Sequence, residues 1–271
     1  MSATTAVKRP SALPDSGQPI PFSRLVSVEF RKSWDTRAGF WLLAVIGLLV
    51  AAAEIICLIV FITQDTQDIT WGVFTTVAAI ITSLLLPVLG IMLVTSEWTQ
   101  RTAMVTFALE PRRGRVILAK LVVGMVLTAV TVVVALVIGL VCNAIFAATG
   151  GHTTWWDQDF TNGLIGFAIN QCLAMFIGFA LAALLLNTAA AIVVFFAYSY
   201  VLPGILAVAA NAIGWFEHVD KWINLSNAQA PLYDFSTMTG SEWAHFVVAT
   251  LIWVGLPLAI GLRRILRAEV K

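Results

Sequence analysis

Few residues of this 271-residue chain have the type and spacing that chemistry requires. Glu54 is the one acidic residue inside a long apolar run, and ionisable residues within a membrane are functional candidates by default. Cys57, Cys142 and Cys172 are too scattered to bind a metal, so we expect them to act as small apolar side chains. We therefore predict no metal site and one candidate carboxylate.

The sequence lacks the motifs for nucleotide hydrolysis and for intramembrane proteolysis. The chain contains no Gly-Lys dipeptide and hence no Gly-x-x-x-x-Gly-Lys-Ser/Thr loop to hold phosphates. A rhomboid-type protease would need Gly-x-Ser-Gly and an intramembrane His, and neither occurs. We predict that this chain is not an enzyme and needs no cofactor of its own. If its work is driven by ATP, a partner chain must bind the ATP and Mg.

The composition excludes a soluble protein. Hydrophobic residues make up 59% of the chain, charged residues 11%, and the mean hydropathy is +0.90. A soluble domain carries roughly 25% charged residues. The net charge of +1 predicts no affinity for nucleic acid, and three cysteines do not make a disulfide-rich secreted scaffold. These values predict a polytopic membrane protein.

Six apolar runs are long enough to cross a bilayer as helices, which need roughly 20 residues each. They cover about residues 40–62, 72–94, 116–148, 164–186, 189–212 and 244–262. Only Asn187 and Thr188 separate the fourth from the fifth, so residues 164–212 also read as one continuous stretch. Because that length is about twice a single span, we favour a hairpin with a tight polar turn.

The basic residues predict the orientation. Of the 16 Lys and Arg residues, 15 precede the first span, lie between the second and third, or follow the sixth, and only Lys221 lies on the other side. Since positive charge marks the cytoplasmic side, we predict a multi-pass protein of the cell membrane with both termini in the cytoplasm.

The segments outside the spans differ in character. Residues 1–21 are rich in Pro and small polar residues, which predicts a disordered cytoplasmic tail. Residues 213–241 are too long and too aromatic for a simple external connection. We expect short helices on the outer mouth, which are either re-entrant or a cap without a gating role.

A basic amphipathic stretch follows the tail. Phe22, Val26, Phe30 and Trp34 recur every four residues, and the charged residues Arg24, Glu29, Arg31, Lys32 and Asp35 point elsewhere. This pattern predicts an interfacial helix whose basic face lies against anionic headgroups. The alternative is a solvated extension of the first span.

The loop between the second and third spans, residues 96–115, has the most distinctive sequence. Glu97 and Arg101 have the i, i+4 spacing of a favourable helical pair. Ala103, Met104 and Phe107 form a short apolar face. Pro111 should end this helix, and the Arg112-Arg113-Gly114-Arg115 turn should return the chain to the membrane at the headgroup layer.

These residues resemble the permease subunits of type-2 ATP-binding-cassette (ABC) exporters. The similar features are the Ser96-Glu97-Trp98 start, the short helix, the Pro111–Arg115 turn that leads into Ala119-Lys120-Leu121, and the Leu185–Ala191 turn. The resemblance extends over residues 22–271, the predicted permease domain. Thr99-Gln100 and Leu186 depart from it, because basic residues or Gly are common there. It implies an all-α polytopic membrane protein with six transmembrane helices and an N-terminal amphipathic interfacial helix.

The resemblance also implies a mechanism. Residues Glu97 to Leu109 would form a coupling helix that sits in a groove of a separate ATPase, so that ATP binding tilts a pair of permeases. The implied coupling residues are Glu97, Trp98, Arg101, Met104, Phe107, Arg112, Arg113 and Arg115. The alternative is that these arginines only satisfy the positive-inside rule.

In the resembled family, the second and fifth spans line the pathway at the interface between two permeases. The implied pathway candidates are Thr75, Thr82, Ser83, Tyr198 and Ser199, together with Glu54. The alternative is that the hydroxyls bond back to their own helices, and that Glu54 reaches external water or pairs across helices. Asn170, Ala174, Gly178 and Ala182 recur every four residues, which predicts close helix packing.

The function that these features predict is the permease subunit of an ATP-driven exporter. It would pair with a second permease copy, identical or related, and with two ATPase subunits in the lipid bilayer. The substrate would be hydrophobic or amphipathic: a drug, lipid, peptide or glycan. A channel, a secondary carrier, or an immunity or sensor protein that shares the fold stays open as an alternative.

Overall fold

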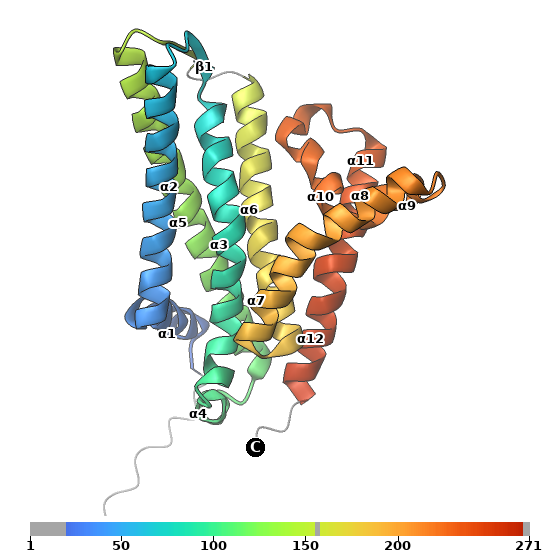
Figure 1. Cartoon of the computed structure of the whole chain (residues 1–271). Coiled ribbons are helices and arrows are strands. Elements are labelled where there is room, and N and C mark those ends of the chain that lie inside the picture. Colours follow the sequence, from blue (N-terminus) through green and yellow to red (C-terminus); the bar gives the residue numbers. More distant parts are fainter. Residues whose placement is uncertain (1–19, 155–157, 268–271) are drawn as a thin grey trace, which may run out of the picture.

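The computed structural model of the chain describes residues 20–154 and 158–267 (Figure 1). Almost all of the predicted tail, residues 1–21, lies outside these ranges. The described part contains six helices, or composite helices, that are long and apolar enough to cross a membrane. They are Arg37–Thr63, Gly72–Thr99, Arg113–Ala148, Thr161–Leu185, Thr188–Ala212 and Gly240–Arg267. The predicted all-α polytopic membrane fold is confirmed.

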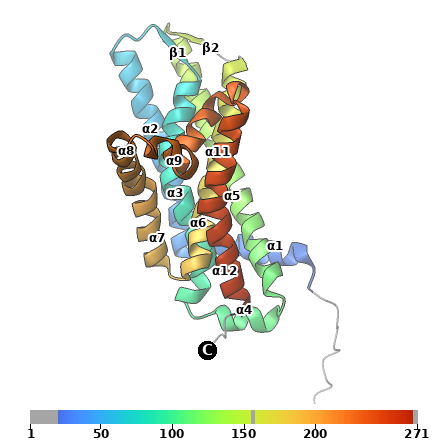
Figure 2. The same ribbon diagram turned by 90° about the vertical axis from the view of Figure 1, so that its right-hand side faces the viewer.

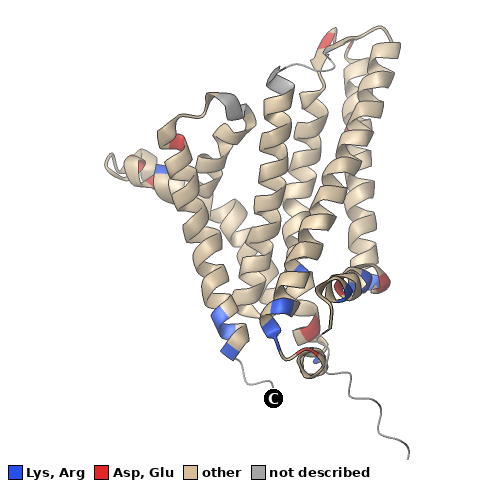
Figure 3. Cartoon of the chain, turned by 180° about the vertical axis from the view of Figure 1, so that it is seen from behind, with Lys and Arg blue, Asp and Glu red and all other residues tan. Residues whose placement is uncertain are grey.

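Charged residues divide the bundle into two unlike ends (Figure 3). Lys and Arg gather where α1, α4 and the C-terminal end of α12 lie, which we call the basic end. Two short strands, β1 (Asp68–Thr70) and β2 (His152–Thr154), pair in parallel at the opposite end (Figure 2). The N-terminal helix, the loop after the second span and the C-terminal end of the chain therefore meet at the basic end, and the strands that follow the first and third spans meet at the other.

Helix α1 (Phe22–Asp35) runs across the basic end of the bundle (Figure 1). The prediction located this helix but did not include the burial of Glu29. Glu29 is buried against the bundle, whereas Phe30 and Trp34 are 41% and 56% exposed. The four-residue spacing could not show this burial, because the partners of this carboxylate are distant in sequence.

Four long helices form the centre of the bundle. They are α2 (Arg37–Thr63), α3 (Gly72–Thr99), α5 (Arg113–Ala148) and α6 (Gln158–Leu185). Helix α6 is the most enclosed, since 67% of its apolar window is buried, against 11% for the span Thr188–Ala212. The fifth span therefore lies at the outside of the bundle, where its apolar side chains face lipid or another chain.

The α3–α6 contact is close because a small-residue seam faces Pro87. A Cβ added to Gly178 would lie 2.1 Å from the Pro87 carbonyl oxygen, and one added to Gly90 would lie 2.8 Å from that of Met175. Ala174 and Ala182 on the same stripe of α6 are buried. The seam therefore joins two helices of one chain, as small residues allow in membranes.

A tight turn separates the fourth span from the fifth. Leu186 has φ +53°, and the Asn187 side chain accepts a hydrogen bond from Ala190 N, which caps the next helix. The fifth span then comprises α7 (Thr188–Phe196), a π-helical turn (Ala197–Val201) and α8 (Leu202–Ala212). The polar turn therefore makes a hairpin of the long apolar stretch.

Short helices connect the fifth span to the sixth. They are α9 (Phe216–Ile223), α10 (Leu225–Gln229) and a 3-10 helix (Ala230–Thr237), followed by α11 (Gly240–Thr250), a second π turn (Leu251–Gly255) and α12 (Leu256–Arg267). Gly166 allows α6 to approach this segment, since its Cβ would clash with Leu232 O. Trp253 Nε1 donates to Ile223 O at 2.6 Å and so ties α9 to the sixth span.

Candidate functional site at the basic end

The loop after α3 contains a separate short helix, α4 (Ala103–Leu109). The predicted single helix from Glu97 to Leu109 is wrong. Arg101 has φ +57°, Thr102 N donates to Glu97 O, and Arg101 N donates to Trp98 O. This pair of bonds around a left-handed residue is the Schellman arrangement that ends helices. Arg101 therefore ends α3 and lets α4 leave in a new direction.

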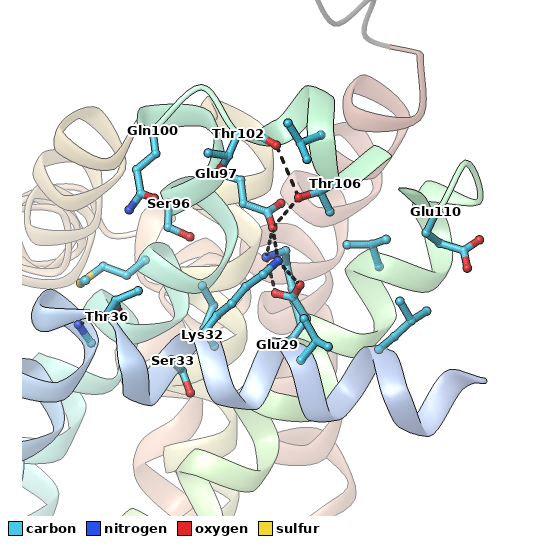
Figure 4. A pocket seen from close by; sticks show the side chains of 18 of the residues that line it. Glu29, Lys32, Ser33, Thr36, Ser96, Glu97, Gln100, Thr102, Thr106 and Glu110 are labelled. Atoms are coloured by element: carbon cyan, nitrogen blue, oxygen red, sulfur yellow. Dashed lines mark hydrogen bonds and ion pairs between the residues drawn. The ribbon is translucent and has the colours of Figure 1, made fainter. Parts of the chain in front are cut away.

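The predicted Glu97–Arg101 pair is also wrong, because Glu97 points to other partners. Its Oε1 accepts from Lys32 Nζ at 2.7 Å and from Thr106 Oγ1 at 3.1 Å, and it lies 3.3 Å from Lys120 Nζ (Figure 4). These partners come from α1, α4 and α5. Glu97 therefore joins four helices at one carboxylate.

Glu29 of α1 completes the arrangement. Its two carboxylate oxygens accept from Lys32 and Lys120, each at 2.6 Å. We call Glu29, Lys32, Glu97 and Lys120 the four-charge cluster. The side chains of Glu29, Glu97 and Lys120 are only 6%, 7% and 6% exposed, whereas that of Lys32 is 42% exposed. The two positive and two negative charges cancel, which is the condition under which charges are tolerated when buried.

The electrostatics of Lys32 follow from this geometry. Burial lowers its pKa, but the hydrogen bonds and charges of Glu29 and Glu97 more than offset burial, so the pKa lies above its ordinary value. Lys32 therefore stays charged at neutral pH. A cation between two carboxylates keeps α1 attached to α3 under those conditions.

Aromatic and basic residues hold the other side of α4. The rings of Trp98 and Phe107 lie 6.3 Å apart, and the Arg113 guanidinium carbon lies 4.9 Å from the centre of the Phe107 ring. Arg113 also donates to Ile265 O, which links this contact to α12. Arg115 pairs with Glu110 at 2.8 Å. A seven-residue helix is too short to be stable alone, so these contacts fix its position.

The predicted coupling residues therefore divide into two groups. Glu97, Trp98, Phe107, Arg113 and Arg115 make contacts inside the protein. Arg101, Met104 and Arg112 are exposed. The sequence interpretation missed Glu29, Lys32 and Lys120 as parts of this site. A signal existed, because Lys120 stands within the apolar pattern that opens the third span, where a lysine needs a partner.

The predicted pathway hydroxyls bond back to their own helix. Thr75, Thr82 and Ser83 donate to Gly72 O, Ala78 O and Ile80 O. Thr82 is fully buried and Ser83 is exposed, so the two differ in access to a pathway.

The fifth-span candidates lie in the first π turn. The Tyr198 ring contacts Trp253 at 4.7 Å between centroids, and Ser199 is half-buried. Because Trp253 belongs to the π turn of the sixth span, the two irregular turns touch. Single π turns inside α-helices occur frequently at functional sites.

Glu54 lies at the junction of α2, α3 and α5. It is fully buried, and neither carboxylate oxygen has a hydrogen-bond partner among the described residues. A Cβ added to Gly139 would lie 3.7 Å from Glu54 Oε2 and 3.0 Å from Phe74 Cβ. The carboxylate therefore occupies a packed environment inside the described chain.

Six apolar spans, with basic residues gathered at one end and a short helix beyond that end, define a multi-pass membrane protein. Residues 25–214 match the family model of the ABC-2 family transporter protein, which is more than half of the chain. The chain belongs to this family, and the resemblance seen in the sequence is confirmed. The membrane domain of this family serves transport and is not itself a catalytic domain. A comparison with curated proteins found no match.

Proposed function

We propose that this chain is the permease subunit of an ATP-driven ABC exporter. It pairs with a second permease and two separate ATPase subunits, which bind ATP and Mg, and it moves a hydrophobic or amphipathic substrate out of the cytoplasm. The basic end faces the cytoplasm, because Lys and Arg concentrate there. The observation that carries this proposal concerns α4: it exposes apolar side chains and is bonded to Glu97 of α3 through Thr106.

Helix α4 offers an apolar surface outside the bundle. Met104, Val105 and Leu109 are 53%, 62% and 71% exposed; Met104 faces away from the rest of the chain, and Val105 and Leu109 also line the space between α4 and α1. They lie on a short helix beyond the basic end, where they can bind in a hydrophobic groove of a partner. Amphipathic helices bind other proteins in this way. Thr106 on the same helix bonds to Glu97, so a displacement of α4 acts directly on α3 and the four-charge cluster.

The exposed surface of the fifth span supports the proposal that two permease copies pair. Val193, Tyr200, Ile205 and Val208 are between 56% and 70% exposed, and little of this span is buried. We propose that this surface and the neighbouring part of α3 line the pathway between two copies. Thr75, Ser83 and Ser199 are then candidates to contact substrate, and Glu54 is a candidate that acts from the buried junction.

The test is co-expression with ATPases encoded by neighbouring genes, followed by purification in nanodiscs and assay of vanadate-sensitive ATP hydrolysis. We expect a stoichiometric ATPase to copurify. The double variant Met104→Ser, Leu109→Ser should lose at least tenfold in coupled ATPase activity and keep its thermal stability.

Val137→Ser is the matched control, because Val137 is 54% exposed on α5 and lies away from α4. This variant should behave as the unmodified chain. Normal coupled turnover in the α4 double variant would contradict the assignment of α4. A clean preparation without any ATPase would favour a channel, a carrier or an immunity protein.

A further inference from the structure

Helix α1 does not close completely against the rest of the basic end. A cavity of about 880 Å³ separates it from α3 and α4 (Figure 4). Its wall combines α1, the first turns of α2 and α5, the last turns of α3, and α4. The apolar part of the lining includes Leu25, Val28, Leu42, Leu89, Leu93 and Val105. The space is therefore mainly hydrophobic but opens beside charged residues.

The charges in the wall neutralise one another except at one point. The four-charge cluster is internally paired, and Glu110 is paired with Arg115. Arg24 also lines the cavity, is exposed, and has no ion-pair partner among the residues that the structure describes. The rim near Arg24 therefore carries an uncompensated positive charge beside an apolar interior.

Because the cavity lies at the ends of the apolar spans, we place it at the level where a bilayer changes from headgroups to acyl chains. Helix α1 is amphipathic and crosses the ends of the spans, as interfacial helices do. A free anion would satisfy Arg24 but leave the apolar wall uncovered. An amphiphile with an anionic headgroup satisfies both parts of the cavity.

We propose that the cavity binds a phospholipid with an anionic headgroup. The headgroup lies at Arg24, and an acyl chain enters between Val28 of α1 and Leu93 of α3. Because Val105 of α4 also lines the cavity, the bound lipid contacts α1, α3 and α4 together. This proposal goes beyond the exporter function and does not depend on it, since the lipid needs only the permease chain.

The experiment is photo-crosslinking of the full chain alone in phosphatidylcholine nanodiscs that contain a small fraction of phosphatidylglycerol with a diazirine on its acyl chain. Mass spectrometry then locates the adducts. We expect adducts on α1 and the last turns of α3, and competition by unlabelled phosphatidylglycerol but not by phosphatidylcholine. Arg24→Gln should lower this labelling about fivefold, as expected for the loss of one cation near an anionic headgroup.

Two matched controls separate the cavity from general contact with lipid. Arg31→Gln removes a charge from the same helix outside the cavity and should leave labelling unchanged. Val28→Trp should obstruct the proposed entry between α1 and α3 and lower the number of cavity adducts, whereas Val137→Trp on the exposed face of α5 should not.

Three results would overturn the proposal. The first is labelling of the cavity that Arg24→Gln and Val28→Trp leave unchanged. The second is equal competition by both lipids. The third is labelling confined to the exposed faces of the spans, with no adducts on α1 or on the last turns of α3.

Discussion

The Lys120 ammonium lies 2.6 Å from Glu29 Oε2 and 3.3 Å from Glu97 Oε1, and only 6% of the Lys120 side chain is exposed. The three residues come from α5, α1 and α3, so one cation joins the interfacial helix to two spans. Glu97 also accepts from Thr106 of α4. Helix α4 is therefore connected to α1 and α5 through the carboxylate of Glu97.

The first prediction concerns removal of this cation. Lys120→Met should lower the free energy of unfolding by about 3–5 kcal/mol, because it leaves buried carboxylates with too few partners. Denaturant-induced unfolding in detergent micelles measures the change. The control is Lys221→Met, which breaks the exposed pair with Glu217 and should cost at most about 1 kcal/mol.

The double variant Glu29→Leu, Lys120→Met refines this test. It removes one charge of each sign and leaves Lys32 paired with Glu97. Because a buried pair that is replaced by apolar side chains costs little, this variant should regain most of the stability. Equal losses in the single and double variants would contradict the electrostatic explanation.

The number of spans and their helical structure were predictable because both depend on local composition. A run of about 20 apolar residues has few alternatives to a membrane helix. The polar turn at Asn187 was predictable for the same reason, since Asn caps helices through its own side chain. The small-residue stripe around Gly178 was also visible, but its partner Pro87 was not.

The sequence indicates that Lys120 needs a partner, but which residues pair in the four-charge cluster was not predictable, since Glu97 is 65 residues from Lys32 and 23 from Lys120 along the chain. Local spacing instead favoured Arg101 as the partner. The backbone prevents that pair, because Arg101 adopts a left-handed conformation and so lies outside the helix that carries Glu97. The sequence interpretation did not predict that Glu29 faces the bundle. Apolar residues at four-residue spacing locate a helix, but they do not show which of its charged residues have partners far away in the sequence.

The second prediction concerns the α3–α6 seam. Gly178→Ala should destabilise the protein by about 1–3 kcal/mol or more, since the new methyl group would overlap the Pro87 carbonyl. Gly47→Ala is the control, because a Cβ there meets nothing within 4 Å. Thermal unfolding in detergent compares the two. Equal melting temperatures would show that α3 and α6 are not in close contact.

The third prediction concerns Trp253. Trp253→Phe removes the indole donor to Ile223 O and should cost about 0.5–1.5 kcal/mol, the usual net contribution of a hydrogen bond, because this bond is only partly buried. The effect should be local. Hydrogen exchange should accelerate in α9, which this bond holds, and stay unchanged in α1. Unchanged exchange in α9 would contradict the anchoring role of Trp253.

The fourth prediction concerns Glu54, whose carboxylate oxygens are both buried without a hydrogen-bond partner in the described part of the chain. Glu54→Met should raise the free energy of unfolding by about 1–3 kcal/mol, because it removes an unsatisfied polar group from a packed junction. The contrasting variant is Glu29→Met, which removes a carboxylate that accepts from two lysines and should destabilise. Unfolding in detergent measures both changes.

A transport assay of Glu54→Met then separates two roles for this residue. Higher stability together with lost transport would mean that the carboxylate is kept for function at a cost in stability, as is typical of charged residues inside membranes. Higher stability with unchanged transport would remove Glu54 from the pathway candidates. Lower stability would contradict the burial argument itself, because it would require a partner that stabilises the carboxylate in the folded protein.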